Sequence, residues 1–189
     1  MDPLSGVFAA FGLAASAGLN AYIPILIMAL VARFTDLITL TSPWDALTSW
    51  WVIGILVVLS VVEFFADKIP AVNHVNDAIQ TFVRPVAGAF AFAVSANVIT
   101  DVSPVLSIIA GLFIAGSVHA AKSAVVRPAV TATTGGIGNV PVSMAEDVAA
   151  LVISILAFVV PVLIASIIIV VTAYIVWLLW RRANAQEAL

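Results

Sequence analysis

The sequence predicts an all-α integral membrane protein with a single domain over residues 1–189, and its composition and charge placement are the evidence. Of the 189 residues, 63% are hydrophobic and 9% are charged, and the mean hydropathy is +1.22. All seven lysines and arginines lie at or near the ends of apolar runs. A bilayer requires apolar runs this long and this numerous, whereas the interior of a soluble protein does not. No basic patch with interleaved aromatic residues occurs, so we expect no nucleic-acid partner.

Six apolar segments predict six transmembrane helices, at residues 4–33, 50–66, 73–100, 105–126, 144–159 and 161–180. A helix rises about 1.5 Å per residue, so roughly 20 residues cross a hydrocarbon core of about 30 Å. The third segment reaches that length only if its helix includes Arg84 and kinks at Pro85. A single helix over residues 144–180 would be about 55 Å long. We therefore predict a tight hairpin at residues 159–161.

The charges predict an orientation. With six spans and a cytoplasmic N-terminus, every lysine and arginine except Arg33 faces the cytoplasm. With five spans, Arg181 and Arg182 face outward and the bias nearly vanishes. Five tryptophans then lie at the two interfaces, namely Trp44, Trp50 and Trp51 outside and Trp177 and Trp180 inside. We expect a multipass protein of the cell (inner) membrane with both termini cytoplasmic.

Small residues recur at helical spacing on two segments. They are Ala87, Ala91 and Ser95 on the third and Gly111 and Ala115 on the fourth. Such stripes let helix backbones approach closely in lipid. Because they exceed what one narrow bundle needs to bury, we expect a homo-oligomer, most simply a dimer.

Residues 69–78 and 140–149 resemble each other. Each has a proline, a polar capping residue and an acidic residue at the start of a membrane helix. This similarity indicates an internal repeat in which helices two and three form a hairpin repeated as helices four and five. An inverted three-plus-three arrangement is the alternative.

Glu63 is the strongest polar signal inside an apolar run. It shares a helix face with Ser60 and Asp67, and a carboxylate at membrane depth lines a watery path or pairs with a cation. The alternative is that Glu63 lies near the membrane interface and simply reaches water. His119 and Lys122 lie three residues apart and face a neighbouring helix, which suggests a Glu63–Lys122 ion pair. His119 would either titrate near neutrality or make a structural hydrogen bond.

Asn20 and Tyr22 lie within residues 18–24, where Gly18 and Pro24 weaken the first helix at mid-depth. Discontinuous helices at this depth build the binding sites of many transporters. A plain proline kink, with Asn20 bonded to another helix, is the alternative.

Three further acids, Asp77, Glu146 and Asp147, open helices, where they serve as caps. Together with Lys68 and Arg84 they could instead form an ion network or a cation site. The polar stretch 131–139 is either a flexible connection or a re-entrant loop that offers backbone groups to an ion.

The polar ends of four helices should converge inside the bundle, because each charge at mid-depth in lipid costs roughly 2.5–3.5 kcal/mol. The five acids outnumber Lys68, Arg84 and Lys122, so the excess favours a proton or metal cation. The sequence therefore predicts a small transporter or channel for a cation or small solute; a non-transporting scaffold or lipid-binding subunit is the alternative. No enzymatic motif occurs, and we expect no enzyme and no cofactor. The candidate binding residues are Asn20, Tyr22, Glu63, Asp67, Asp77, His119, Lys122, Glu146 and Asp147.

Five segments carry a resemblance to a known family. They are GLNAYIP (18–24), EFFADKIP (63–70), NDAIQTFVRP (76–85), HAAK (119–122) and AEDVAAL (145–151). With them the chain resembles the small multipass membrane proteins catalogued as domain of unknown function 4126. The resemblance implies a common polytopic fold and marks the candidate residues above, with Lys68 and Arg84, as the polar signature of the family in this chain. It implies no activity.

Overall fold

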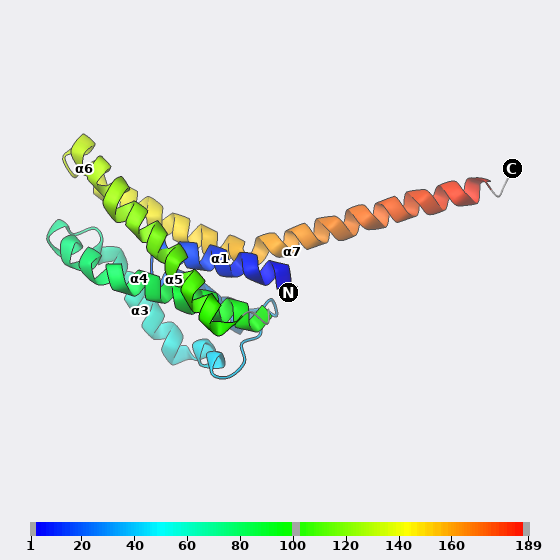
Figure 1. Ribbon diagram of the computed structural model, residues 1–189, viewed down its shortest axis with the longest axis horizontal. Helices are drawn as coiled ribbons and strands as arrows, with labels where there is room; N and C mark the ends of the chain where they lie inside the picture. Colours follow the sequence, from blue (N-terminus) through cyan, green and yellow to red (C-terminus); the bar gives the residue numbers. More distant parts are fainter. Residues whose placement is uncertain (1–2, 100–102, 187–189) are drawn as a thin grey trace.

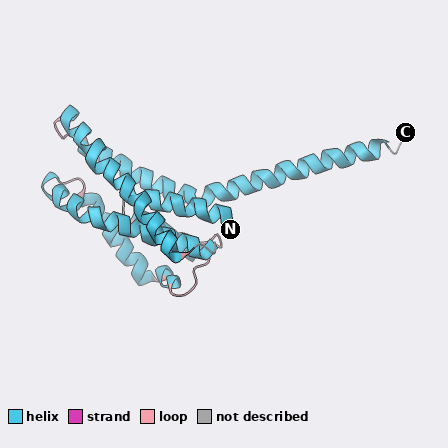
Figure 2. Cartoon of the chain, in the orientation of Figure 1, coloured by secondary structure: helices cyan, strands magenta, loops and turns pink. Residues whose placement is uncertain are grey.

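The computed structural model describes residues 3–99 and 103–186, and every regular element in these ranges is a helix (Figures 1 and 2). The helices are α1 (Pro3–Leu19), α2 (Ile23–Phe34), η1 (Trp44–Thr48), α3 (Trp50–Ala66), α4 (Pro70–Ile99), α5 (Pro104–Ala121), η2 (Lys122–Val126), α6 (Arg127–Thr134) and α7 (Asn139–Gln186). Six apolar stretches of these helices are membrane-span candidates or shorter apolar helices. The predicted all-α membrane fold is therefore confirmed.

The first apolar segment is broken where the sequence predicts, but its two halves fold back on each other. Along α1, Gly12 lies against Ala157 and Asn20 bonds to Asp147, so α1 runs antiparallel to α7. From the break onward α2 returns toward the end from which α1 came, since Phe34 packs on Trp50 at the start of α3. Residues 4–33 are thus a helical hairpin, and the prediction of one kinked span is wrong.

Pro24 explains why the chain turns here. It lies in the first turn of α2, where a proline loses no helical hydrogen bond and its fixed φ favours helix initiation. The proline therefore begins a new helix after the break. Pro85, by contrast, lies inside α4, which continues through it as predicted.

Three hairpins turn at the same end of the bundle. Their tips are residues 20–22 between α1 and α2, residues 67–69 between α3 and α4, and residues 135–138 between α6 and α7. At the third tip, Gly135 ends α6 with a φ of 63°, a conformation that glycine adopts without strain. The α3–α4 and α5–α7 hairpins have the same sense, as the predicted hairpin repeat requires.

The predicted hairpin at residues 159–161 is absent, because α7 is one helix over Asn139–Gln186. Its C-terminal half leads away from the other helices (Figure 1). A tight turn needs glycine, which adopts the required φ values, or short polar residues, whose side chains bond to the backbone of the turn. Residues 157–164 contain neither. The only turn signal, Pro161, is tolerated in a membrane helix, so the helix continues.

This arrangement also overturns part of the predicted orientation. The N-terminal end of α1 and the C-terminal end of α7 both lie away from the three hairpin tips (Figure 1). The polar residues at the tips and the two termini therefore cannot all lie on the cytoplasmic side.

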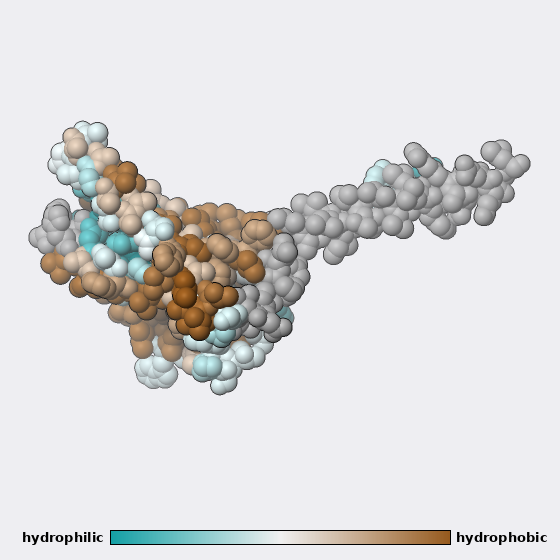
Figure 3. Space-filling view, in the orientation of Figure 1, coloured by the Kyte–Doolittle hydropathy of each residue, from teal (hydrophilic) through white to brown (hydrophobic). Residues whose placement is uncertain are grey.

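Small residues bring α1, α4 and α5 into close contact, as their spacing predicts. Gly88 on α4 faces Gly111 and Ala115 on α5, and a Cβ added at Gly111 would lie 2.7 Å from the Ala89 Cα. Around this core the coloured surface is mostly apolar, and hydrophilic atoms gather near α4 and α6 at the end with the hairpin tips (Figure 3). The bundle is built for a lipid environment with one polar end.

Candidate functional site

The turn between α1 and α2 has its own local cap. The side-chain Oδ1 of Asn20 accepts hydrogen bonds from the backbone N–H groups of Tyr22 (3.2 Å) and Ile23 (3.1 Å). These groups open α2 and have no partner within the helix. The Asn20 amide nitrogen in turn donates to Asp147 on α7 at 3.0 Å. Asn20 therefore ends one helix, begins the next and ties the turn to α7.

Glu63 holds the remaining N–H group of the turn. Both of its carboxylate oxygens accept from the backbone N–H of Ala21, at 3.3 and 3.1 Å. Oε1 also accepts from Arg84 Nε at 3.2 Å and Nη2 at 2.9 Å. Glu63 is 1% exposed and Arg84 is fully buried. The carboxylate thus lies at the positive end of α2, where the helix dipole stabilises it, and a guanidinium neutralises it.

Lys122 lies at the other side of the break. Its ammonium donates to the carbonyl of Leu19, the last residue of α1, at 3.3 Å. A cation at a helix C-terminus is stabilised by the dipole, as an anion is at an N-terminus. The start of α2 therefore meets the negative charge of Glu63 from α3, and the end of α1 meets the positive charge of Lys122 from η2.

Asp67 is the centre of the cluster. Its Oδ2 lies 3.3 Å from Arg84 Nη2, 3.4 Å from Lys122 Nζ and 3.3 Å from Arg127 Nη2. Its Oδ1 accepts from the Asn76 amide at 2.6 Å. Three cations from three elements thus meet at one carboxylate oxygen.

A π-helical turn makes this convergence possible. Residues Lys122–Val126 form η2, and the N–H of Arg127 bonds to the carbonyl of Lys122, five residues earlier. In a regular α-helix these two side chains would point well apart. The wider turn directs both toward Asp67, and π-helical turns of this kind are frequent at functional sites.

Four more ion pairs extend the cluster. Lys68 pairs with Asp147 at 2.8 Å, and Glu146 pairs with Lys122 at 2.8 Å and Arg127 at 3.5 Å. Asp77 lies 3.8 Å from Arg127. We call these nine residues the ion network: Glu63, Asp67, Lys68, Asp77, Arg84, Lys122, Arg127, Glu146 and Asp147. Five carboxylates and four cations leave it with one net negative charge.

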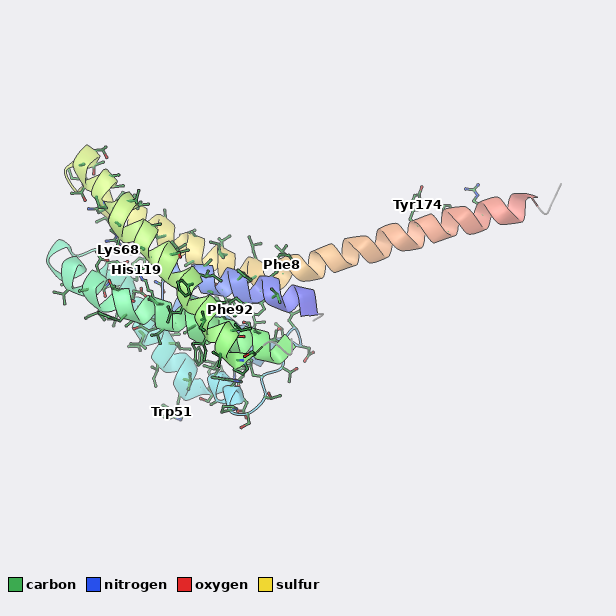
Figure 4. All side chains as sticks on the ribbon, viewed as in Figure 1. Phe8, Trp51, Lys68, Phe92, His119 and Tyr174 are labelled. Carbon is green, nitrogen blue, oxygen red and sulfur yellow. The ribbon has the colours of Figure 1, made fainter. Side chains whose placement is uncertain are left out.

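His119 lies beside the ion network in a defined tautomer. Its Nδ1 is 3.3 Å from Arg84 Nη1, and its Nε2 is 3.2 Å from the Thr81 hydroxyl oxygen. A guanidinium only donates, so Nδ1 accepts and the ring hydrogen resides on Nε2. The Thr81 hydroxyl donates onward to the Asp77 carbonyl at 2.8 Å. The histidine is a neutral acceptor that orients Arg84. Figure 4 labels the place of His119 in the fold.

Most of the predicted site residues meet here. Asn20, Glu63, Asp67, Asp77, His119, Lys122, Glu146 and Asp147 all belong to the ion network or contact it. Tyr22 does not, because its side chain is half-buried against the apolar core and, among the described residues, its hydroxyl makes no hydrogen bond. The predicted Glu63–Lys122 pair is also not formed, since Glu63 pairs with Arg84 and Lys122 with Asp67 and Glu146. Arg127 was missed as a site residue.

Each carboxylate of the ion network lies within 4 Å of a cation. An apolar groove of about 460 Å³ lies elsewhere, lined by eight residues of α2, η1, α3 and α4 that include Phe82 and Phe90. Within residues 3–99 and 103–186, no group of three or more histidine, aspartate or glutamate side chains is arranged to hold a metal ion.

Comparison with known proteins gives one match. The family model described as Domain of unknown function (DUF4126) matches residues 7–181. Neither the curated proteins nor the solved structures contain a match to the chain. The family match includes every residue of the ion network and covers far more than half of the sequence. The protein is therefore a member of the DUF4126 family.

Proposed function

We propose that the protein is a small membrane transporter or channel for a cation or small solute, coupled to a proton, and that the ion network is its closed cytoplasmic end. The observation that supports this proposal best is the α1–α2 turn inside the ion network. Irregular backbone at membrane depth is found where it is buried in protein or lines a water-filled path. Transporters build such sites from broken helices whose free N–H and C=O groups contact ions or substrate. Here those groups contact Glu63 and Lys122.

A non-transporting scaffold or lipid-binding subunit is the second candidate, and the pairing of every acid in the ion network with a cation favours it. Each of its acids has a cation within 4 Å, and Glu63 is almost completely buried. In a scaffold these pairs only hold the helices together. In a transporter the same pairs must separate in a second conformation that opens the path. Ion-dependent flux therefore distinguishes the two candidates.

The experiment is flux into liposomes that contain purified protein, with wild type compared with Glu63→Gln. The substitution removes the charge that faces Arg84 and the Ala21 N–H while preserving side-chain volume. We expect flux driven by a proton or cation gradient in wild type and at least a tenfold loss in the variant. Asp45→Asn, on η1 at the opposite end of the bundle, is the matched control and should retain flux. A folded wild type without flux of any cation would exclude transport.

We further propose that the hairpin tips face the cytoplasm of the cell membrane, because four of the seven lysines and arginines lie in the ion network. A cysteine in place of Ile137 should then be labelled from the cytoplasmic side. A cysteine in place of Asp36, in the loop at the opposite end, should be labelled from the outside. Labelling of both from one side would contradict this arrangement.

We also propose a homodimer, although not through the small-residue stripes, which pack α4 against α5 and α1 within one chain. The proposal rests on the C-terminal half of α7, which leaves its own bundle (Figure 1) and is strongly apolar over residues 161–180. Native mass measurement in nanodiscs should give twice the chain mass of 19.7 kDa. A single-chain mass would contradict it.

A further inference from the structure

The apolar groove lies along α4, away from the ion network. Its eight lining residues are all apolar; five of them lie on α4 between Phe82 and Phe90, and one each comes from α2, η1 and α3. Phe82 is 76% exposed and Val86 is 63% exposed, so the groove is open at its side. This part of α4 belongs to the membrane-span candidate Val75–Ala96. The groove therefore opens toward the acyl chains of the bilayer.

The dimensions of the groove suit one acyl chain better than a helix. Phe82 and Phe90 are eight residues apart, which is about 12 Å along α4. A volume of about 460 Å³ over this length gives a mean cross-section of about 40 Å². An α-helix with its side chains is about 10–12 Å wide, which needs at least about twice that cross-section. An acyl chain is much thinner and reaches about 15 Å into the bilayer, half the thickness of the hydrocarbon core.

A cation lies at one end of the groove. Leu47 of η1 lines the groove, and the backbone carbonyl of the next residue, Thr48, accepts a hydrogen bond from Nη1 of Arg33. The guanidinium carbon of Arg33 is 4.1 Å from the ring centroid of Trp50, a side chain that is 61% exposed. Tryptophan is enriched at the level of the lipid headgroups. Arg33 is thus a cation at headgroup level beside the groove.

No acid neutralises this cation in the described part of the chain. Asp36 and Asp45 lie at the same end of the bundle, and neither forms an ion pair with Arg33 there. A guanidinium has five N–H donors, of which the Thr48 carbonyl takes one. A phosphate group accepts two such donors side by side. The charge and the donors of Arg33 are therefore suited to a phosphate.

We propose that the groove binds one phospholipid of the bilayer, with an acyl chain between α3 and α4 and the phosphate on Arg33. A phospholipid is the ligand whose apolar chain and anionic group are joined in the order in which the groove and Arg33 occur. Figure 1 shows α3 and α4 diverging from their shared tip, and the acyl chain fills the space between them. This inference goes beyond the proposed transport and holds equally for a scaffold.

Native mass spectrometry of the purified protein in detergent, titrated with phosphatidylglycerol, tests the proposal. A parallel titration uses diacylglycerol with the same acyl chains, which lacks the phosphate. We expect wild type to retain one phosphatidylglycerol molecule, with an affinity about fivefold higher than that for diacylglycerol. Arg33→Gln removes the charge, so it should lower the affinity for phosphatidylglycerol about fivefold and leave that for diacylglycerol unchanged.

Ala87→Phe tests the groove itself. Ala87 lines the groove, and a phenyl ring there occupies the place of the acyl chain. The affinity for both lipids should fall about tenfold or more, because methylene groups lose their apolar contacts. Gly54→Phe is the matched control, since a Cβ at this position of α3 meets nothing within 4 Å, and it should bind both lipids as wild type does.

Phe82→Ala gives a second test that does not crowd the helices. It removes part of the groove wall at a side chain that is already 76% exposed, and it should weaken the binding of both lipids. Phe113→Ala is its control, because Phe113 is 67% exposed on α5 and does not line the groove.

Three results would overturn the proposal. Equal lipid affinities in wild type, Ala87→Phe and Phe82→Ala would exclude the groove as the site. An equal effect of Arg33→Gln on both lipids would exclude the phosphate contact. A dimer that retains no lipid and dissociates in Ala87→Phe would make a second copy of the chain the occupant. Flux into liposomes enters none of these results, so the transport proposal can fail while the lipid site stands, and the reverse.

Discussion

Replacing Arg84 with methionine should lower the free energy of unfolding by about 3–5 kcal/mol, since removing one partner of a buried ion pair leaves the other charge uncompensated. Arg84 is fully buried, and its guanidinium contacts Glu63 at 2.9 Å, Asp67 at 3.3 Å and His119 at 3.3 Å. Methionine fills a similar volume without charge. Chemical unfolding in detergent micelles, followed by tryptophan fluorescence, measures the difference.

A double-mutant cycle separates this pair from the rest of the network. Glu63→Gln combined with Arg84→Met removes both charges, so the double variant should be more stable than the sum of the two single losses predicts. Arg84→Lys keeps the charge but not the two-pronged contact with Glu63, and we expect an intermediate loss. Arg33→Met, which removes an exposed cation that stacks on Trp50 at the opposite end, is the control. Equal losses for Arg33→Met and Arg84→Met would show that the ion network does not stabilise the fold.

Gly111→Ala should destabilise the protein by about 1–3 kcal/mol, the usual cost of overpacking. The new methyl group would overlap the carbonyl oxygen of Gly88 and approach the Phe92 Cβ to 2.7 Å. Backbone atoms cannot move aside as a flexible side chain can, so α4 and α5 must separate. Thermal unfolding in the same detergent measures the loss.

Gly54→Ala is the matched control, because a methyl group there meets nothing within 4 Å. Alanine also favours a helix over glycine by about 0.5–1 kcal/mol, so this variant should be as stable as wild type or slightly more so. A loss in Gly54→Ala equal to that in Gly111→Ala would point to a general effect of glycine replacement. The close contact of α4 with α5 would then not be the cause.

Apolar runs and charge placement predict most of the fold, because length and hydropathy report directly on whether a segment can cross a bilayer. The segments at residues 50–66 and 73–100 correspond to α3 and α4 within a few residues. The errors concern turns. Gly18 and Pro24 locate the break after α1, but nothing in the local sequence says whether α2 continues forward or folds back. That choice depends on Glu63, Lys122 and Asp147, which lie far along the chain.

The candidate site could be predicted as a group of residues but not as a set of pairs. Burying charge in lipid is costly, so the acids and cations at helix ends had to meet, and eight of the nine predicted residues do. The sequence does not predict which cation pairs with which acid, because the pairing depends on how each helix is rotated about its axis. Arg127 shows this clearly, since regular α-helical geometry places it away from Lys122 and only the π-helical turn η2 aligns the two. Tyr22 makes no hydrogen bond or ion pair with the ion network for the opposite reason, because a polar tip does not prevent an aromatic ring from packing in an apolar core.

The α1–α2 turn has a consequence for how the chain is made. Its polar groups are near the N-terminus, but their partners come 42 residues later at Glu63, 103 later at Lys122 and 127 later at Asp147. During synthesis the first hairpin therefore forms before any of these partners: the Ala21 N–H waits for Glu63, the Leu19 carbonyl for Lys122, and the Asn20 amide for Asp147 on α7. Unsatisfied backbone groups in hydrocarbon are costly, so the nascent hairpin needs water or another protein at its tip during this interval. The turn is thus completed in three steps, by α3, by η2 and finally by α7, and a chain that ends before Asn139 lacks only the partner of the Asn20 amide.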